Sequence, residues 1–195
     1  MRYVVLLRGV NVGGRNKVPM AVLRERLARD FTGVATYIQS GNVVLESELT
    51  AAGVSAHVED VLAAGFDLDT GPVRALTLGA EAFGSVLDDA PAGFGSEPGT
   101  YRYDVGFYVG VSAAEVEPHV PADPAVDEVA FGPLAFYHRR LNALATRSRV
   151  TRIVGTPVYA SLTLRNWRTT TTLAEMVGAP HEAHGTSPGG DAAGA

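Results

Sequence analysis

The order of the apolar segments constrains the fold of this chain more than any other feature of its sequence. In the first 79 residues, short runs rich in Val, Leu and Tyr, which favour strands, alternate with longer segments whose apolar residues recur at helical spacing. The expected order is strand, helix, strand, strand, helix, strand, at residues 3–9, 19–30, 34–39, 43–46, 51–66 and 72–78. This βαββαβ order is that of the ferredoxin-like fold. We therefore predict one ferredoxin-like half over residues 1–79.

The same order recurs later in the chain, after an expected linking helix and loop at residues 80–102. The predicted elements of this second set are strand, short helix, two hairpin strands, helix and strand, at residues 103–109, 113–117, 126–131, 134–138, 146–154 and 158–164. We predict a second ferredoxin-like half over residues 103–178, which includes a terminal helix at 166–177. Residues 179–195 are rich in Gly, Ala and Pro, and we predict that they are disordered. The predicted fold class is α+β, with two βαββαβ halves and a C-terminal helix.

Composition excludes several classes of protein. No apolar run approaches the roughly 18–20 residues that a membrane span needs, so we expect no membrane partner. The chain has no cysteine, which excludes disulfides and cysteine-ligated zinc and is compatible with the cytoplasmic location that we expect. His181 and His184 have no carboxylate cluster beside them, so no metal is predicted. The nucleotide-binding fingerprints GxxxxGK[ST] and GxGxxG are absent, and we predict no cofactor.

The charges are strongly segregated, although the net charge is only −5. Residues 1–29 carry a net +6 and residues 139–168 a net +7, whereas residues 30–138 carry −15 and hold only Arg74 and Arg102 as basic residues. The two basic segments form either one positive surface or separate solvated faces, depending on the fold. Because a dedicated nucleic-acid binder is usually basic overall, we favour a small anionic or polar ligand over nucleic acid as the partner.

Two polar loops are expected to meet at one edge of the first sheet. The first and second strands of a ferredoxin-like sheet run in the same direction, so the loop at 9–18 and the turn at 39–42 follow strand ends on the same edge. The helix that begins at Pro19 adds the partial positive charge of its N-terminus. We predict a site for an anion or a small polar ligand at this edge. Its candidate residues are Arg8, Asn11, Gly13, Gly14, Asn16, Lys17, Gln39, Ser40 and Asn42.

The stretches LLRGVNVGGRNKVPMAVLRERL, TYIQSGNVVLES and TLRNWRTTTTL resemble the signature of the DUF1697 family, a domain of unknown function. The resemblance extends over residues 1–178 and implies a bacterial, cytoplasmic protein with a two-part α+β fold and no established activity. It adds Gly9, Gly41, Arg165, Asn166 and Trp167 to the candidate residues. Among these, Arg165 follows a predicted strand, where its guanidinium suits a carboxylate or phosphate ligand, or an acidic partner from the middle segment.

Each motif also has a structural explanation. Gly13 and Gly14 suit a turn with positive φ, and Ser40 to Asn42 suits a hairpin turn. None of the five histidines is predicted beside Ser40, so we identify no catalytic residue and leave enzymatic activity open. Three hypotheses follow: a binding site at the edge of the first sheet, a nucleic-acid-associated protein that contacts phosphates through residues 1–29 and 139–168, or a purely structural or homodimeric role. The sequence does not indicate the oligomeric state.

Overall fold

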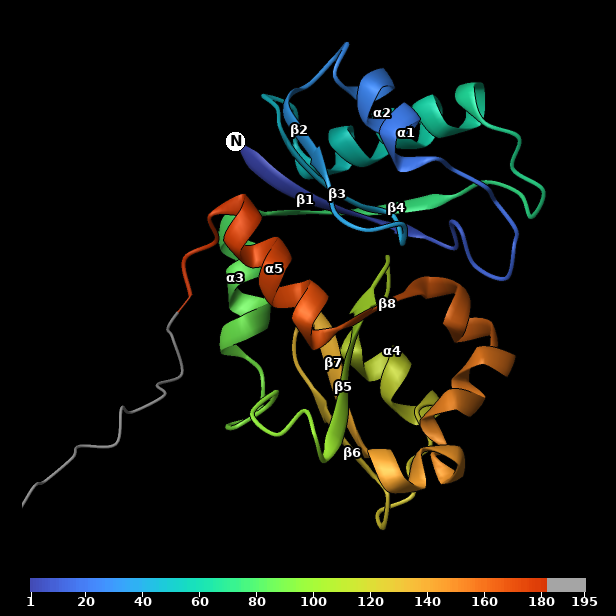
Figure 1. The fold of residues 1–195 in the computed structure, drawn as a ribbon, viewed down its shortest axis with the longest axis vertical. Coiled ribbons are helices and arrows are strands. Elements are labelled where there is room, and N and C mark those ends of the chain that lie inside the picture. The colour runs from blue at the N-terminus through green and yellow to red at the C-terminus, as the bar shows by residue number, and fades with distance from the viewer. Residues whose placement is uncertain (182–195) are drawn as a thin grey trace, which may run out of the picture.

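The first half of the chain folds around a four-stranded antiparallel sheet in the computed structural model, which describes residues 1–181 (Figure 1). The strand order is β2-β3-β1-β4, which is the ferredoxin-like order, and the prediction for this half is confirmed. His184 and most of the predicted disordered tail lie outside the described residues. The elements are β1 (Arg2–Arg8), α1 (Met20–Leu27), β2 (Thr32–Thr36), β3 (Asn42–Glu46), α2 (Ala51–Gly65) and β4 (Arg74–Gly79).

The second half repeats the topology, with strand order β6-β7-β5-β8. Its strands are β5 (Tyr101–Tyr108), β6 (Asp127–Phe131), β7 (Ala135–Leu141) and β8 (Leu162–Asn166). Its helices are α3 (Ala80–Asp88), which links the halves, α4 (Ala113–Val116), and α5 (Trp167–Val177) at the end of the described chain. Short 3₁₀ helices complete it: η1 (Glu117–His119), η2 (Asn142–Arg147), η3 (Val150–Gly155) and η4 (Pro157–Ser161).

The helix predicted at 146–154 is replaced by the end of η2 and by η3, and η4 occupies the first residues of the strand predicted at 158–164, which begins only at Leu162. The stretch 146–154 is rich in β-branched residues, and Gly155 and Pro157 follow it directly, so a long α-helix is disfavoured. Val150 and Ile153 are three residues apart and both buried, as the three-residue repeat of a 3₁₀ turn requires.

Strand β1 is buried on both faces, which explains its unbroken apolar sequence. Alternate side chains point to opposite faces of a strand. Val5 and Leu7 therefore pack beneath α1 and α2, whereas Val4 and Leu6 join a second core. That second core also contains side chains of α3, α5 and the second sheet, such as Phe107. Helices α3 and α5 thus lie against both sheets (Figure 1).

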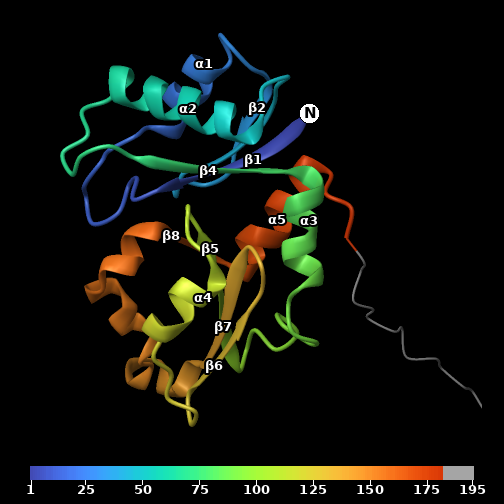
Figure 2. The same cartoon turned by 180° about the vertical axis from the view of Figure 1, so that it is seen from behind.

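The other face of the second sheet packs against α4 and the 3₁₀ helices, as seen from behind in Figure 2. Val116 of α4 and Ile153 of η3 contribute to this third core. Among residues 1–181, no helix is long and apolar enough to cross a membrane.

Candidate functional site

The loop after β1 is a small hairpin. The Asn11 N–H donates to the Asn16 carbonyl (3.1 Å), and the Arg15 N–H donates to the Val12 carbonyl (3.1 Å). Between them, Gly13 and Gly14 have φ of 59° and 77°, the paired positive values of a type I′ turn. No atom lies within 4 Å of an added Cβ at either glycine, so backbone conformation, and not space, requires glycine here. The turn explanation of the two glycines is confirmed.

Asn11 joins this hairpin to the turn between β2 and β3. Its side-chain Nδ2 donates to the carbonyls of Val18 (2.8 Å) and Gln39 (2.8 Å), and its Oδ1 accepts from the Val18 N–H (2.9 Å). The two predicted loops therefore do meet at one edge of the first sheet. Gln39 contributes its backbone to this contact, and its side chain is exposed.

Asn16 anchors the other end of the hairpin and is buried. Its Nδ2 donates to the Gly9 carbonyl (3.1 Å), and its Oδ1 accepts from the Thr70 N–H (3.1 Å). By contrast, Lys17 and Arg15 are exposed, and their side chains have no hydrogen bond or ion pair within the described part of the chain. Asn16 therefore positions the loop, and Lys17 and Arg15 are its free cations.

Arg165 reaches the N-terminal edge, across the boundary between the halves. It is 7% exposed, and burial lowers the pKa of its guanidinium to about 10, so the group is charged at pH 7. No carboxylate of residues 1–181 pairs with it, so the acidic partner considered from the sequence is not found there. Its nitrogens donate to the carbonyls of Leu7 (3.0 Å), Gly41 (3.1 Å) and Leu164 (2.7 Å), to Thr163 Oγ1 (3.0 Å) and to Asn42 Oδ1.

Two hydrogen bonds from the side chain of Asn42 hold the turn beside Arg165 in place. Asn42 is fully buried, and its Nδ2 donates to the Tyr37 carbonyl (3.0 Å) and to Ser40 Oγ (3.0 Å). Because Ser40 Oγ accepts this bond, its own O–H is free to donate elsewhere.

Arg8 also crosses between the halves, where its Nη2 donates to the Tyr159 carbonyl (3.1 Å).

A pocket of about 340 Å³ lies between this turn and the second sheet, and we call it the junction pocket. The second sheet presents Arg102 and Asp104, two residues apart on β5 and hence on one face, and Arg140, which is paired with Arg102 across β5 and β7. The remaining lining residues come from the turn and from the end of β8 and start of α5: Ile38, Ser40, Leu164, Arg165, Asn166 and Thr169.

The junction pocket has an excess of positive charge. Its three guanidinium groups belong to Arg102, Arg140 and Arg165, and its one carboxylate to Asp104. The Asp104 Oδ2 lies 3.4 Å from Arg102 Nε and 3.7 Å from Arg140 Nη2, so a single carboxylate serves two arginines. The Nε of Arg140 is buried and has no hydrogen-bond partner among the described residues. The lining thus carries two uncompensated positive charges and at least one unused buried donor.

Sequence reasoning missed Arg102, Asp104 and Arg140. One signal was present: Arg102 is one of only two basic residues in the acidic segment 30–138. The register that brings Arg140 opposite Arg102 is a tertiary feature, which the sequence pattern alone does not reveal.

A wider groove of about 720 Å³ adjoins the junction pocket, and we call it the aromatic groove. Arg102 and Asn166 line both. Asn166 is also the N-cap of α5, because its Oδ1 accepts from the Thr169 N–H (2.8 Å). The other lining residues of the groove are Gly95, Pro98, Tyr101, Tyr103, Asn142, Trp167, Arg168 and Thr171.

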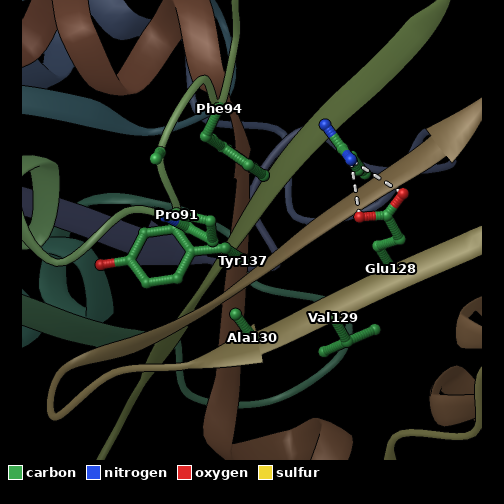
Figure 3. Close-up of a pocket in the computed structure, with 8 residues that line it drawn as sticks. Pro91, Phe94, Glu128, Val129, Ala130 and Tyr137 are labelled. Atoms are coloured by element: carbon green, nitrogen blue, oxygen red, sulfur yellow. Dashed lines mark hydrogen bonds and ion pairs between the residues drawn. The ribbon is translucent and has the colours of Figure 1, made fainter. Parts of the chain in front are cut away.

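A third pocket, of about 220 Å³, lies over β6 and β7 and is mainly apolar (Figure 3). Phe94, Ala130 and Tyr137 contribute to its wall, and Glu128 forms an ion pair with Arg139 at 2.7 Å. These two charges neutralise each other, and the Tyr137 hydroxyl already donates to the Val86 carbonyl (2.6 Å). This pocket therefore lacks the uncompensated polar groups of the junction pocket.

A buried histidine–aspartate pair lies in the second sheet. His138 Nε2 is 3.0 Å from Asp127 Oδ1, and Asp127 also accepts from the Arg149 N–H (2.9 Å). Burial alone would raise the pKa of Asp127, but the hydrogen bonds that it accepts lower this pKa to about 2. Burial lowers the pKa of His138 despite the nearby carboxylate. Neither residue lines any of the three pockets, so the pair fixes β6, β7 and η3 together.

Comparison with solved structures shows a similar fold in a bacterial protein. The conserved bacterial protein SP0830 from Streptococcus pneumoniae matches with a TM-score of 0.77 and 27% sequence identity, over 90% of this chain and 98% of that chain. No curated protein sequence matches. The family described as "Protein of unknown function (DUF1697)" matches residues 1–137, which include the first two motifs that carry the resemblance. The chain belongs to the DUF1697 family.

Proposed function

We propose that this protein binds a small anion, a phosphate monoester or a carboxylate, in the junction pocket. The observation that carries the proposal is the convergence of Arg102, Arg140 and Arg165 on a pocket that contains one carboxylate. Planar guanidinium groups recognise carboxylate and phosphate oxygens with paired hydrogen bonds. An anion would offset the excess positive charge and accept from the unused Nε of Arg140 and the free hydroxyl of Ser40.

Some of the candidate residues line the junction pocket in this proposal, and others hold the loops beside it in place. Ser40 and Arg165 line the pocket, whereas Asn11, Asn16 and Asn42 hold the two loops in place. Because the protein already accepts hydrogen bonds from all three guanidinium nitrogens of Arg165, this residue would contribute its charge more than new hydrogen bonds. Direct ligand binding by Lys17 and by the N–H groups of the glycine turn stays a prediction.

The proposal is for binding and not for catalysis, because the pocket offers no evident general base. Asp104 is the one carboxylate of its lining, and it is already paired with Arg102 and Arg140. We also propose that the protein is cytoplasmic. A chain without cysteine forms no disulfide, so its stability does not depend on an oxidising compartment.

The test is a thermal-shift titration with inorganic phosphate, pyrophosphate and citrate at low salt. We expect a saturable rise in melting temperature for at least one anion, as ligand binding to the folded state requires. Arg140→Gln should abolish this rise. Arg139→Gln is the matched control, since the adjacent residue on β7 projects from the opposite face of the sheet and lines the apolar pocket. An equal loss of the shift in both variants, or its persistence in Arg140→Gln, would contradict the proposal.

A second candidate is a phosphate-binding surface for nucleic acid. Its support is the contact between Arg8 and Tyr159, which brings the two basic segments side by side. The two segments also carry exposed basic residues: Arg149 at the N-cap of η3, Arg152 within η3, and Lys17 after the first hairpin. Binding of this kind weakens steeply with salt, whereas a small anion in a pocket gives a stoichiometric, saturable signal. A 20-nucleotide duplex titrated at two salt concentrations separates the two candidates.

A further inference from the structure

Resting on the proposed anion site, we infer that the ligand is a nucleotide, whose phosphate occupies the junction pocket and whose base occupies the aromatic groove. The two cavities adjoin at the edge of the second sheet, where Arg102 and Asn166 line both of them; Tyr101 and Tyr103 alternate with Arg102 along β5 and so lie on the other face. A simple inorganic anion or a small dicarboxylate would occupy the junction pocket and leave the aromatic groove empty. The combined shape therefore suits an anionic group that is linked to a second, planar part.

The walls of the groove are aromatic and held rigid. Trp167 packs edge-on against Phe94, with 5.1 Å between ring centroids. A Cβ at Gly95 would lie 2.2 Å from the indole Nε1, so glycine allows the backbone to approach the ring closely. Tyr103 is buried, and its hydroxyl accepts from the Glu97 N–H (3.1 Å).

Tyr101 forms the outer part of the same wall. The guanidinium of Arg139 covers its ring at 4.7 Å from the centroid. Aromatic side chains fixed in this way offer flat surfaces on which a base stacks at low cost in side-chain entropy.

Polar groups in the groove suit the edge of a base. Asn142 Nδ2 donates to the carbonyls of Pro98 (3.3 Å) and Gly99 (3.0 Å), which fixes the orientation of the amide. Its Oδ1 has no partner among residues 1–181 and can accept from an exocyclic amino group. Arg168 is exposed, and its guanidinium likewise has no partner in that range. Arginine stacks on bases as well as on aromatic side chains.

Trp167 is the only tryptophan of the chain, so its fluorescence reports on the groove directly. We would titrate the protein with adenosine 5′-monophosphate, uridine 5′-monophosphate, ribose 5-phosphate and inorganic phosphate, and measure affinities in parallel by calorimetry. We expect at least one nucleotide to quench Trp167 and to bind about tenfold more tightly than ribose 5-phosphate, as stacking of one base implies.

Three variants make the test specific. Trp167→Leu should reduce the affinity for the nucleotide to that for ribose 5-phosphate and leave the affinity for ribose 5-phosphate unchanged, whereas Trp167→Phe should restore most of the difference. Arg140→Gln should abolish the binding of every compound. Circular dichroism of each variant checks that the fold is retained.

The outcomes separate this inference from the proposed function. If phosphate and ribose 5-phosphate bind as tightly as the nucleotides, and Trp167→Leu changes nothing, the inference is wrong and the anion site stands. If none of the four compounds binds but citrate does, the inference is wrong and the anion site stands; if citrate also fails to bind, both are wrong. A 5′-phosphorylated trinucleotide that binds more tightly than the mononucleotide would overturn the assignment to a free nucleotide and indicate the end of a nucleic-acid strand.

Discussion

Arg165 is predicted to hold the two halves together, and its replacement by methionine tests this role. Methionine replaces the unbranched stem of the side chain as far as Nε and removes all of the donors. The guanidinium donates three hydrogen bonds across the boundary, to Leu7, Gly41 and Asn42. A hydrogen bond to a charged group contributes about 1.5–3 kcal/mol, so three contribute about 5–9 kcal/mol if they are independent.

Removing the charge also relieves a cost. Burial lowers the pKa of Arg165 from 12.5 to about 10, and at 1.36 kcal/mol per pKa unit this corresponds to roughly 3 kcal/mol. We therefore expect Arg165→Met to lower the free energy of unfolding by about 2–6 kcal/mol. Arg165→Lys should recover little, because an ammonium group cannot reproduce the planar set of donors.

The assay is urea denaturation at pH 7, followed by the fluorescence of Trp167 and by circular dichroism. Arg168→Met is the control, because the side chain of Arg168 is exposed and has no partner among the described residues, and the substitution should change the free energy of unfolding by less than about 0.5 kcal/mol. A midpoint for Arg165→Met equal to or above that of the wild type would refute the reasoning. It would mean that the cost of burying the charge outweighs the three hydrogen bonds.

Three further predictions concern the loops and the buried pair. Gly14→Ala should destabilise the protein by about 1–2 kcal/mol in thermal melts, because alanine is strained at φ 77°, whereas Gly99→Ala, which has similar space but no positive φ, should have little effect. Asn11→Ala should cost about 1–3 kcal/mol and speed amide hydrogen exchange around Gln39; unchanged exchange there would show that the loops are held by other contacts. The low pKa of Asp127, about 2 against 3.8 when unfolded, gives stability that is complete above pH 4 and is lost as the pH falls towards 2. Wild type and Asp127→Asn should accordingly differ in melting temperature at pH 7 and converge at pH 2, and a difference that does not depend on pH would be inconsistent with this assignment.

The sequence predicted what depends on the order of neighbouring elements. The two βαββαβ halves follow from apolar spacing, and the contact between Asn11 and Gln39 follows from the topology of a single sheet. Asparagine is a favoured N-cap residue, so the N-cap at Asn166 also depends on local sequence alone. Each of these features is determined within one half of the chain.

Features that depend on the packing of one half against the other could not be predicted. The position of Arg165 beside Leu7 follows from how α3 and α5 fill the space between the sheets. The pairing of Arg102 with Arg140 follows from the register of β5 and β7, in which a shift of one residue would turn either side chain to the other face. The junction pocket is therefore a tertiary feature, although one of its arginines stands out in the acidic segment.

The most direct test of the anion site is to observe the side-chain Nε–H signals of the arginines by NMR during titration with inorganic phosphate. The account predicts saturable shifts for Arg140 and Arg102 and none for Arg139, on the opposite face of β7. Shifts confined to Arg15 would contradict it and favour a binding site in the first loop, and no shift at any arginine would contradict it and favour a purely structural role for these motifs.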